Sequence, residues 1–137
     1  MGLTVVDAGV IIGLLDRTDA HHDAARSALR VCVERGDRLL LPASALAEVL
    51  VAPSRRGGDA VGVVRGLVER VPLRIVALDE PIAIAAAAVR AQHPAVKLPD
   101  ALIIATASVL SAETLLTTDR RWPTPRKLGL TATVHTI

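Results

Sequence analysis

The sequence predicts an α/β fold, a three-layer sandwich whose central parallel sheet of about four or five short strands carries helices on both faces. Two observations lead to this prediction. Short apolar runs rich in Val, Leu and Ile alternate along the chain with longer segments of helical spacing. The chain has 137 residues, the usual size of one domain with one hydrophobic core. We therefore expect residues 1–137 to form a single domain.

The N-terminal part of the chain alternates two strands with two helices. Leu3 to Val6 is a short β-branched run that predicts a buried strand, and Val10 to Leu15 has helical character. His22 to Arg35 repeats apolar residues at helical spacing and is followed by a glycine, a common stop signal. Arg38 to Leu41 predicts a second strand, which Pro42 closes.

The middle of the chain predicts two helices separated by a loop. Ser44 is a suitable N-cap for a helix that extends to about Ala52. The stretch Pro53 to Gly58 combines proline, serine and two glycines, and it is the clearest loop signal in the sequence. Asp59 can cap the next helix, which extends to about Arg70 before a proline ends it.

The C-terminal part continues the alternation. Arg74 to Leu78 predicts a third strand, and the alanine-rich segment Pro81 to Gln92 predicts a helix. Pro99 opens another helix, to about Ser111, because proline is favoured in the first helical turn. The remaining segments are a strand at Thr114 to Thr117, a loop at Arg120 to Lys127 and an edge strand at Thr131 to His135.

The composition narrows the class of protein. Apolar residues make up 51% of the chain and the mean hydropathy is +0.45, values that exclude general disorder. The single cysteine, Cys32, excludes an internal disulfide and a cysteine-rich zinc site, and its apolar neighbours predict burial. No apolar run approaches the roughly 18 residues that span a bilayer. The N-terminal residues also lack a signal-peptide pattern, so we expect a cytoplasmic protein.

Four carboxylates, those of Asp7, Glu48, Asp100 and Asp119, lie inside or at the end of apolar runs. Removing one unpaired carboxylate from water costs several kcal/mol, and two that are about 4 Å apart repel by roughly 4 kcal/mol at an effective dielectric near 20. A fold that gathers them needs a compensating cation. Hard oxygen ligands suit Mg²⁺, and Mn²⁺ can substitute for it.

The order of elements indicates that the four acids can converge. Asp7 and Asp119 each follow a predicted strand, and parallel strands end at one edge of the sheet. We expect Asp100 to begin a helix where the chain has just left that edge, and Glu48 to reach back from the middle of a helix. Taken singly, each acid has an ordinary alternative: Asp7 as an N-cap, Asp100 as a helix-dipole partner, Glu48 as a solvated residue and Asp119 as a turn residue.

In this pattern the chain resembles the PIN-domain ribonucleases, and within them the VapC-type toxins of type II toxin–antitoxin pairs. The resemblance covers nearly the whole length, and its third stretch is the most specific. It rests on the strand ending in Asp7, on Ala43-Ser44-Ala45-Leu46-Ala47-Glu48, on Leu98-Pro99-Asp100-Ala101-Leu102-Ile103-Ile104-Ala105-Thr106-Ala107, and on Leu115-Leu116-Thr117-Thr118-Asp119-Arg120-Arg121-Trp122.

The resemblance implies a PIN-like sandwich and a set of site residues. The four acids match the family's catalytic acidic site; our candidates for direct metal ligands are Asp7, Asp100 and Asp119. Thr117 matches a supporting hydroxyl, and Trp122 matches an aromatic residue that follows the last acid. One departure is Gly9, since the family often has Ser or Thr two residues after the first Asp.

The resemblance also implies an activity and partners. The activity is Mg²⁺- or Mn²⁺-dependent endonucleolytic hydrolysis of RNA by a metal-activated water, which leaves 5′-phosphate and 3′-hydroxyl ends. The partners are a VapB-type antitoxin and a second copy of the chain. Without aromatic stacking platforms, we expect RNA to be recognised by charge and shape, as in a tRNA or an rRNA stem. Five arginines in predicted loops near the strand ends are candidates for contacting RNA: Arg17, Arg55, Arg56, Arg120 and Arg121.

Two other functions compete with this interpretation. A haloacid-type hydrolase or phosphotransferase would use Asp7 as a nucleophile, but it usually needs a second Asp at the position of Gly9. A non-catalytic binding module would keep the fold and recognise RNA or protein. The presence of all four acids argues against that module, because an inactive descendant would be expected to lose one of them.

Overall fold

Five parallel strands form the centre of the molecule in the computed structural model, which describes residues 2–137. The strands lie in the order β3-β2-β1-β4-β5, so β1 is central and β3 and β5 are the edges. Every neighbouring pair is parallel. Their bounds are β1 Leu3–Val6, β2 Arg38–Pro42, β3 Leu73–Val76, β4 Thr114–Thr117 and β5 Thr133–Thr136.

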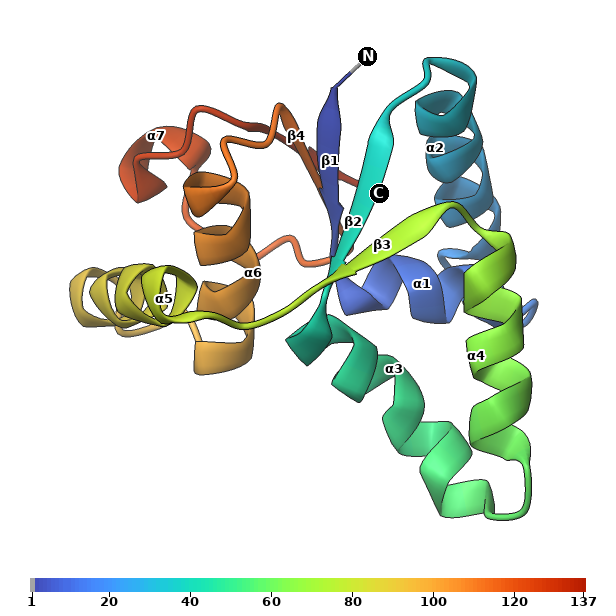
Figure 1. The fold of residues 1–137 in the computed structure, drawn as a ribbon. Helices are drawn as coiled ribbons and strands as arrows, with labels where there is room; N and C mark the ends of the chain where they lie inside the picture. Colours follow the sequence, from blue (N-terminus) through green and yellow to red (C-terminus); the bar gives the residue numbers. More distant parts are fainter. Residues whose placement is uncertain (1) are drawn as a thin grey trace.

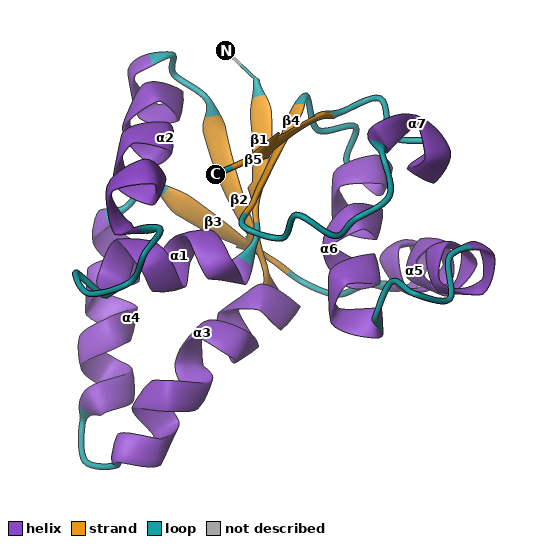
Figure 2. Ribbon diagram, turned by 180° about the vertical axis from the view of Figure 1, so that it is seen from behind, coloured by secondary structure: helices purple, strands orange, loops and turns teal. Residues whose placement is uncertain are grey.

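Helices cover both faces of this sheet and give the molecule three layers (Figure 1). One face carries α5 and α6, which pack side by side, with α7 beside them; the other carries α1, α2 and α4 (Figures 1 and 2). The helix α3 leads away from the sheet edge and packs against α4. The bounds are α1 Ala8–Leu15, α2 His22–Glu34, α3 Ala43–Arg56, α4 Ala60–Arg70, α5 Glu80–Gln92, α6 Leu98–Val109 and α7 Pro125–Leu128.

The central strands are buried because helices cover both of their faces, which explains why they are continuous apolar runs. Val5 and Val6 of β1 are fully buried, as are Leu41 of β2 and Leu115 of β4. Val5 pairs with Leu115 in the register between β1 and β4. The sheet and the apolar sides of the helices thus form one aliphatic core.

The topology fixes where a site can form. From β1 the chain builds the sheet outward through β2 to β3, and then returns to place β4 on the opposite side of β1. The strand order therefore reverses between β1 and β4. In open parallel sheets, ligands bind beyond the carboxyl ends of the strands at such a switch point. Asp7 follows β1 and Asp119 follows β4, so these two acids flank it.

The predicted fold class is confirmed, and two strands have the predicted bounds. The prediction for α3 is wrong at both ends. The helix begins at Ala43, directly after Pro42, so Ser44 is not its N-cap. It also continues through Pro53 to Arg56, where we expected a loop. Proline removes one helical hydrogen bond, but Pro53 is buried one turn after the buried Val49, and this packing offsets the loss.

One further detail differs from the sequence prediction. The predicted loop at 120–127 ends in the short helix α7, in which the Thr124 side chain accepts a hydrogen bond from the Lys127 backbone N–H at 3.4 Å. Gly129 then ends that helix with a φ of 67°, a left-handed conformation that glycine adopts freely.

No helix in residues 2–137 has the length and apolar character needed to cross a bilayer.

Candidate active site

Asp7 lies at the carboxyl end of β1 and starts α1. Its Oδ1 accepts a hydrogen bond from the Ala8 backbone N–H at 2.8 Å, and its own backbone N–H donates to the Leu116 carbonyl at 2.9 Å. Asp7 is therefore the N-cap of α1, as the ordinary alternative for this residue proposed. Capping uses only one carboxylate oxygen, however, and Asp7 is also one of the few buried charged or polar residues of the core, with 8% exposure.

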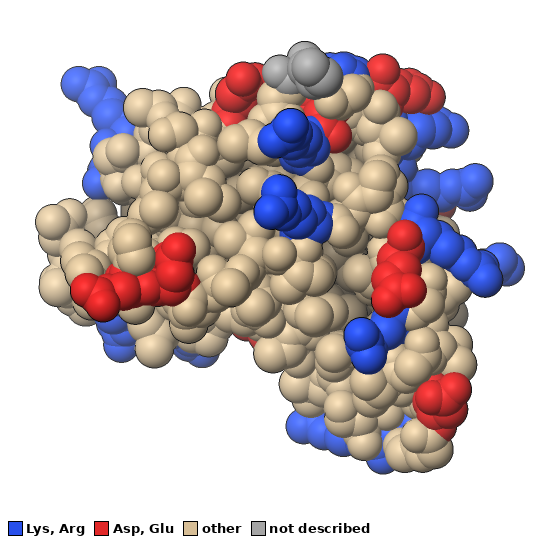
Figure 3. Space-filling view, viewed as in Figure 1, with Lys and Arg blue, Asp and Glu red and all other residues tan. Residues whose placement is uncertain are grey.

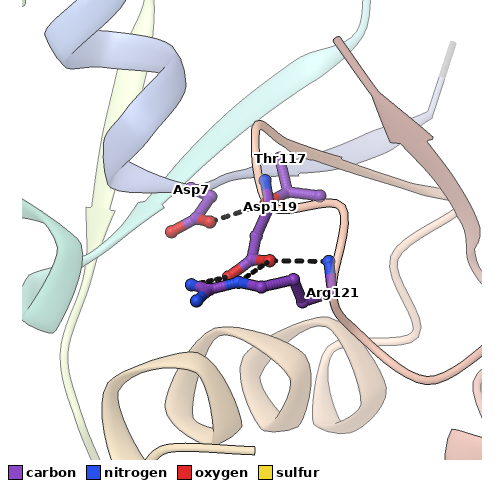
Figure 4. A network of polar contacts seen from close by, with 4 residues as sticks. All are labelled: Asp7, Thr117, Asp119 and Arg121. Carbon is purple, nitrogen blue, oxygen red and sulfur yellow. Dashed lines mark hydrogen bonds and ion pairs between the residues drawn. The ribbon is translucent and has the colours of Figure 1, made fainter.

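Thr117 links the two strands that flank the switch point. It is the last residue of β4 and is fully buried. Its hydroxyl donates to Oδ2 of Asp7 at 2.8 Å and accepts from the backbone N–H of Asp119 at 3.0 Å (Figure 4). One hydroxyl therefore fixes the second oxygen of Asp7 and the backbone position of Asp119, as expected for the supporting residue that the sequence suggested.

Asp119 follows β4 and pairs with an arginine. Its Oδ1 accepts from the Arg121 backbone N–H at 2.8 Å, and its two oxygens lie 3.4 Å from Nε and Nη2 of the guanidinium. Figure 4 shows the Arg121 side chain folded back along Asp119 toward the side where Asp7 lies. The Asp119 side chain is 17% exposed and that of Arg121 is 84% exposed, so the cation lies over the acids from the solvent side.

Asp100 and Glu48 approach from two helices. Asp100 lies in the first turn of α6 and is half-buried. The chain reaches it from α5, so our expectation that it directly follows the sheet edge is wrong; the packing of α5 against α6 brings it there instead. Glu48 lies in the second turn of α3, which starts at the carboxyl end of β2, and it is the most exposed of the four acids.

The electrostatics show that the four acids share one location. Burial raises the pKa of Asp7 most, with Asp100 and Asp119 adding repulsion, while the bonds from Thr117 and Ala8 oppose the rise. Burial also raises the pKa of Glu48, and Asp7 and Asp100 raise it further. These mutual effects connect acids from four separate elements. The raised pKa values mean that Asp7, Glu48 and Asp100 resist carrying their charges in the absence of a compensating cation.

Asp100 has the most varied surroundings of the four acids. Burial raises the pKa of its carboxyl and the neighbouring Asp119 adds to the rise. The indole of Trp122, followed by Arg121 and Lys97, lowers the pKa of the same carboxyl.

The donor set fits a hard divalent cation. Within residues 2–137, no three acidic, histidine or cysteine side chains are placed closely enough to hold a metal ion directly. A cation at this place would be held by one or two carboxylates and by water, a coordination that Mg²⁺ commonly adopts. The all-carboxylate composition, the raised pKa values and the guanidinium resting on Asp119 each indicate a location that attracts cations.

Thr118 has a packing role against Gly9 that the sequence did not predict. A Cβ at Gly9 would stand 3.3 Å from Cβ and Cγ2 of Thr118 and would meet its hydroxyl oxygen. Thr118 therefore occupies the space into which a side chain at position 9 would extend. Gly9, where the chain departs from the family pattern, therefore lies against Thr118, and the small residue leaves room for the larger one. A hydroxyl group is present beside the first turn of α1, although it comes from the residue that follows β4.

The proposed arginines do not gather around the acids. Arg121 pairs with Asp119, Arg120 is its exposed sequence neighbour, and Arg17 lies in a turn as predicted. Arg55 and Arg56 lie in the last turn of α3, not in a loop, and that prediction is wrong. Because α1 and α3 both lead away from the sheet edge, Arg17, Arg55 and Arg56 lie at their far ends (Figure 1). On the face seen in Figure 3, basic side chains are dispersed and interleaved with acidic ones.

Comparisons with known proteins place this fold in a family. The profile of the PIN domain family matches residues 4–128, which is most of the chain. The chain therefore belongs to the PIN domain family. No curated protein matches the chain.

Solved structures give the same fold. VapBC2 from Rickettsia felis, bound to a DNA fragment from its promoter, aligns with a TM-score of 0.77 and 14% identity over 98% of each chain. A toxin–antitoxin complex from Klebsiella pneumoniae gives 0.70 and 23% identity over 86% of this chain and 88% of the other. Mycobacterium tuberculosis VapC20, a sarcin-ricin loop cleaving toxin, gives 0.69 and 17% identity over 86% and 91%.

Proposed function

We propose that this protein is a metal-dependent endoribonuclease and the toxin of a VapBC-type toxin–antitoxin pair. The observation that carries the proposal is the meeting of four carboxylates from four elements at the switch point of the sheet. Membership of the PIN domain family and the likeness to VapC structures support it. The activity belongs in the cytoplasm, where an RNA substrate and an antitoxin would be met.

The acids have distinct roles in this proposal. Asp7, Asp100 and Asp119 would hold Mg²⁺, or Mn²⁺ in its place, with one or two of them binding directly and the rest through water, and Glu48 would act through water. A bound divalent cation supplies a Lewis acid that lowers the pKa of water and offsets charge on the phosphate. Thr117 holds the carboxylate of Asp7 and the backbone of Asp119 in fixed relative positions through its two hydrogen bonds. Glu48, whose burial-raised pKa favours protonation, is our candidate for receiving the proton that the water loses.

Hydrolysis by water fixes the products. Because water attacks the phosphorus and the 3′ oxygen leaves, the fragments should carry 5′-phosphate and 3′-hydroxyl ends. The ribose 2′-hydroxyl takes no part in that displacement. Cyclic 2′,3′-phosphate ends would therefore point to a different mechanism.

The substrate we propose is a folded RNA such as a tRNA or an rRNA stem. Trp122 is the only aromatic residue of the chain apart from histidines, and it packs against the hydrophobic core, so we expect little base stacking from Phe, Tyr or Trp. Arg121 pairs with Asp119, and we propose that it and its sequence neighbour Arg120 contact the phosphates near the scissile bond. Binding should fall steeply as salt is added.

The partners we propose are a VapB-type antitoxin and a second copy of the chain. The Klebsiella pneumoniae structure is a toxin–antitoxin complex, and the Rickettsia felis structure is VapBC2, which supports an antitoxin partner. The α3 and α4 helices expose the apolar residues Val51, Val63 and Leu67, which favours association with another protein. Light scattering at tens of micromolar checks the homodimer, and a monomer at that concentration would contradict it.

The test of the activity is cleavage of total cellular RNA by the purified protein. The reactions contain Mg²⁺ or Mn²⁺, with EDTA as one control and Asp100→Asn as another. Asp23→Asn is the matched variant, because it removes a carboxylate from an exposed position on α2. We expect discrete fragments with 5′-phosphates from the wild type and Asp23→Asn, and none from Asp100→Asn or with EDTA. Cleavage by a well-folded Asp100→Asn variant would contradict the site assignment.

The rival to test against is a non-catalytic PIN-fold binding module. That module would bind RNA or protein without metal-dependent cleavage. A folded protein that binds Mn²⁺ and RNA but releases no fragments from any RNA pool would favour the module.

A further inference from the structure

The indole of Trp122 holds a buried hydrogen-bond donor that has no full partner. Within residues 2–137, its Nε1 is the one buried side-chain nitrogen or oxygen that lacks a hydrogen bond. Leaving a buried donor unsatisfied costs about 1–3 kcal/mol, so such groups are rare and call for an explanation. This one lies in the loop that follows Asp119, next to the candidate active site.

The group that faces this donor is the carboxyl of Asp100. The Trp122 side chain lies within reach of the Asp100 carboxyl as a hydrogen-bond donor, and it lowers the pKa that burial and Asp119 raise. The contact falls short of hydrogen-bond geometry, because Nε1 remains without a partner. The two groups therefore lie close together without being fully engaged.

The ring and the nitrogen of Trp122 have separate tasks. The ring packs against the hydrophobic core, a role that a phenylalanine could share. The N–H is a pure donor and has no acceptor capacity, so it favours the charged carboxylate, which is the stronger acceptor, over the neutral acid. Hydrogen bonds from outside the coordination sphere orient carboxylate ligands and raise metal affinity, commonly by 10–100-fold.

We propose that Trp122 is a positioning residue whose indole N–H donates to Asp100 and holds that carboxylate in the orientation required to bind the divalent cation. This inference rests on the proposed function, since it concerns the same acids. It assigns to one nitrogen atom a task that packing of the ring cannot perform. The neighbouring cations Arg121 and Lys97 stabilise the charge of Asp100, but long flexible side chains fix its direction less well.

The first experiment needs no metal. Trp122 is the only tryptophan, so a ¹⁵N–¹H spectrum contains a single indole resonance. We expect Asp100→Asn to move this resonance, because it replaces the charged acceptor. Glu48→Gln is the matched control: it removes one charge from the same cluster, yet Trp122 is not among the groups that act on Glu48. An indole resonance that is unchanged in Asp100→Asn, or that moves equally in both variants, would overturn the proposed contact.

The second experiment removes the N–H and keeps the shape. Growth with β-(3-benzothienyl)alanine places sulfur where the indole carries N–H, and the single tryptophan confines the change to position 122. We expect Mn²⁺ to bind about tenfold more weakly by calorimetry, while thermal unfolding without metal stays within a few degrees of that of the wild type. Trp122→Phe serves as the genetic version of the same change and should show the same loss.

The possible outcomes distinguish failure of the proposed N–H role from failure of the proposed nuclease function. Wild-type protein that binds Mn²⁺, with a benzothienyl protein that binds it equally well, would overturn the role of the N–H and leave the nuclease proposal standing. Wild-type protein that binds neither Mn²⁺ nor Mg²⁺ would overturn the proposed function and this inference together. Weaker binding in the benzothienyl protein, accompanied by loss of its metal-free fold, would assign Trp122 to packing and contradict a positioning role.

Discussion

Replacing Asp7 by asparagine should stabilise the metal-free protein while it abolishes metal binding. The charge of Asp7 is buried, with 8% exposure, and lies beside two other acids. Asparagine keeps the shape and remains a good N-cap, since Asn and Asp are about equal at that position. Its oxygen can still accept from the Ala8 N–H, as Oδ1 of Asp7 does.

The magnitude follows from opposing terms. Burying one carboxylate costs several kcal/mol, and the substitution removes that cost. Two hydrogen bonds of 2.8 Å to a charged group become neutral ones, a loss of roughly 1 kcal/mol each. The Thr117 hydroxyl can rotate to accept from the new amide while it still accepts from Asp119. The net gain is about 1–2 kcal/mol, or roughly 3–8 °C in Tm for a chain of this size.

The assay is thermal and urea unfolding at pH 7 in EDTA, repeated with Mn²⁺. The wild type should gain stability from Mn²⁺, because a ligand that binds only the folded state raises Tm, and Asp7→Asn should gain none. A metal-free Asp7→Asn protein that is 2 kcal/mol less stable than the wild type would refute the reasoning. It would show that Asp7 serves as a stabilising cap and not as a strained ligand.

Three further predictions concern pH, Gly9 and Arg121. The folded pKa of Asp7 is raised by burial, so the native state binds its proton more tightly than the unfolded chain does, and stability is lost as pH rises from the ordinary value through the raised one. The stability difference between Asp7→Asn and the wild type should therefore widen from pH 4 to pH 8; a constant difference in urea unfolding would contradict the raised pKa. Gly9→Ala should destabilise the wild type by about 1 kcal/mol because of its contact with Thr118, yet stabilise a Thr118→Ala background by up to about 1 kcal/mol through helix propensity; equal effects in both backgrounds would show that the two residues are uncoupled. Arg121→Ala should raise Mn²⁺ affinity by up to about fivefold, the worth of an exposed ion pair, because the guanidinium resting on Asp119 competes for the site; weaker binding than in the control Arg120→Ala would show that Arg121 assists the metal.

The fold and two of the acids follow from local signals. Short apolar strands alternating with helices predict a parallel sheet, and an acid one or two residues after a strand must lie near its carboxyl edge. Asp7 and Asp119 satisfy that rule. The position of Asp100 depends on how α5 packs against α6, which is a tertiary contact that no local pattern contains.

The remaining features come from contacts between distant segments. The bond from Thr117 to Asp7 spans 110 positions of sequence, and the fit of Thr118 against Gly9 is equally remote. The continuation of α3 through Pro53 depends on burial of that proline, which overrides its breaking tendency. A sequence pattern names the residue types at such places, but only packing decides which atoms meet.

Calorimetric titration of Mn²⁺ into the wild type and four single variants tests the central claim most directly. The account predicts that the wild type and Asp23→Asn bind Mn²⁺ alike, and that Asp7→Asn, Asp100→Asn and Asp119→Asn each bind it at least about tenfold more weakly. Equal binding by all five proteins, or no binding by the folded wild type, would contradict the claim that these carboxylates form a cation site.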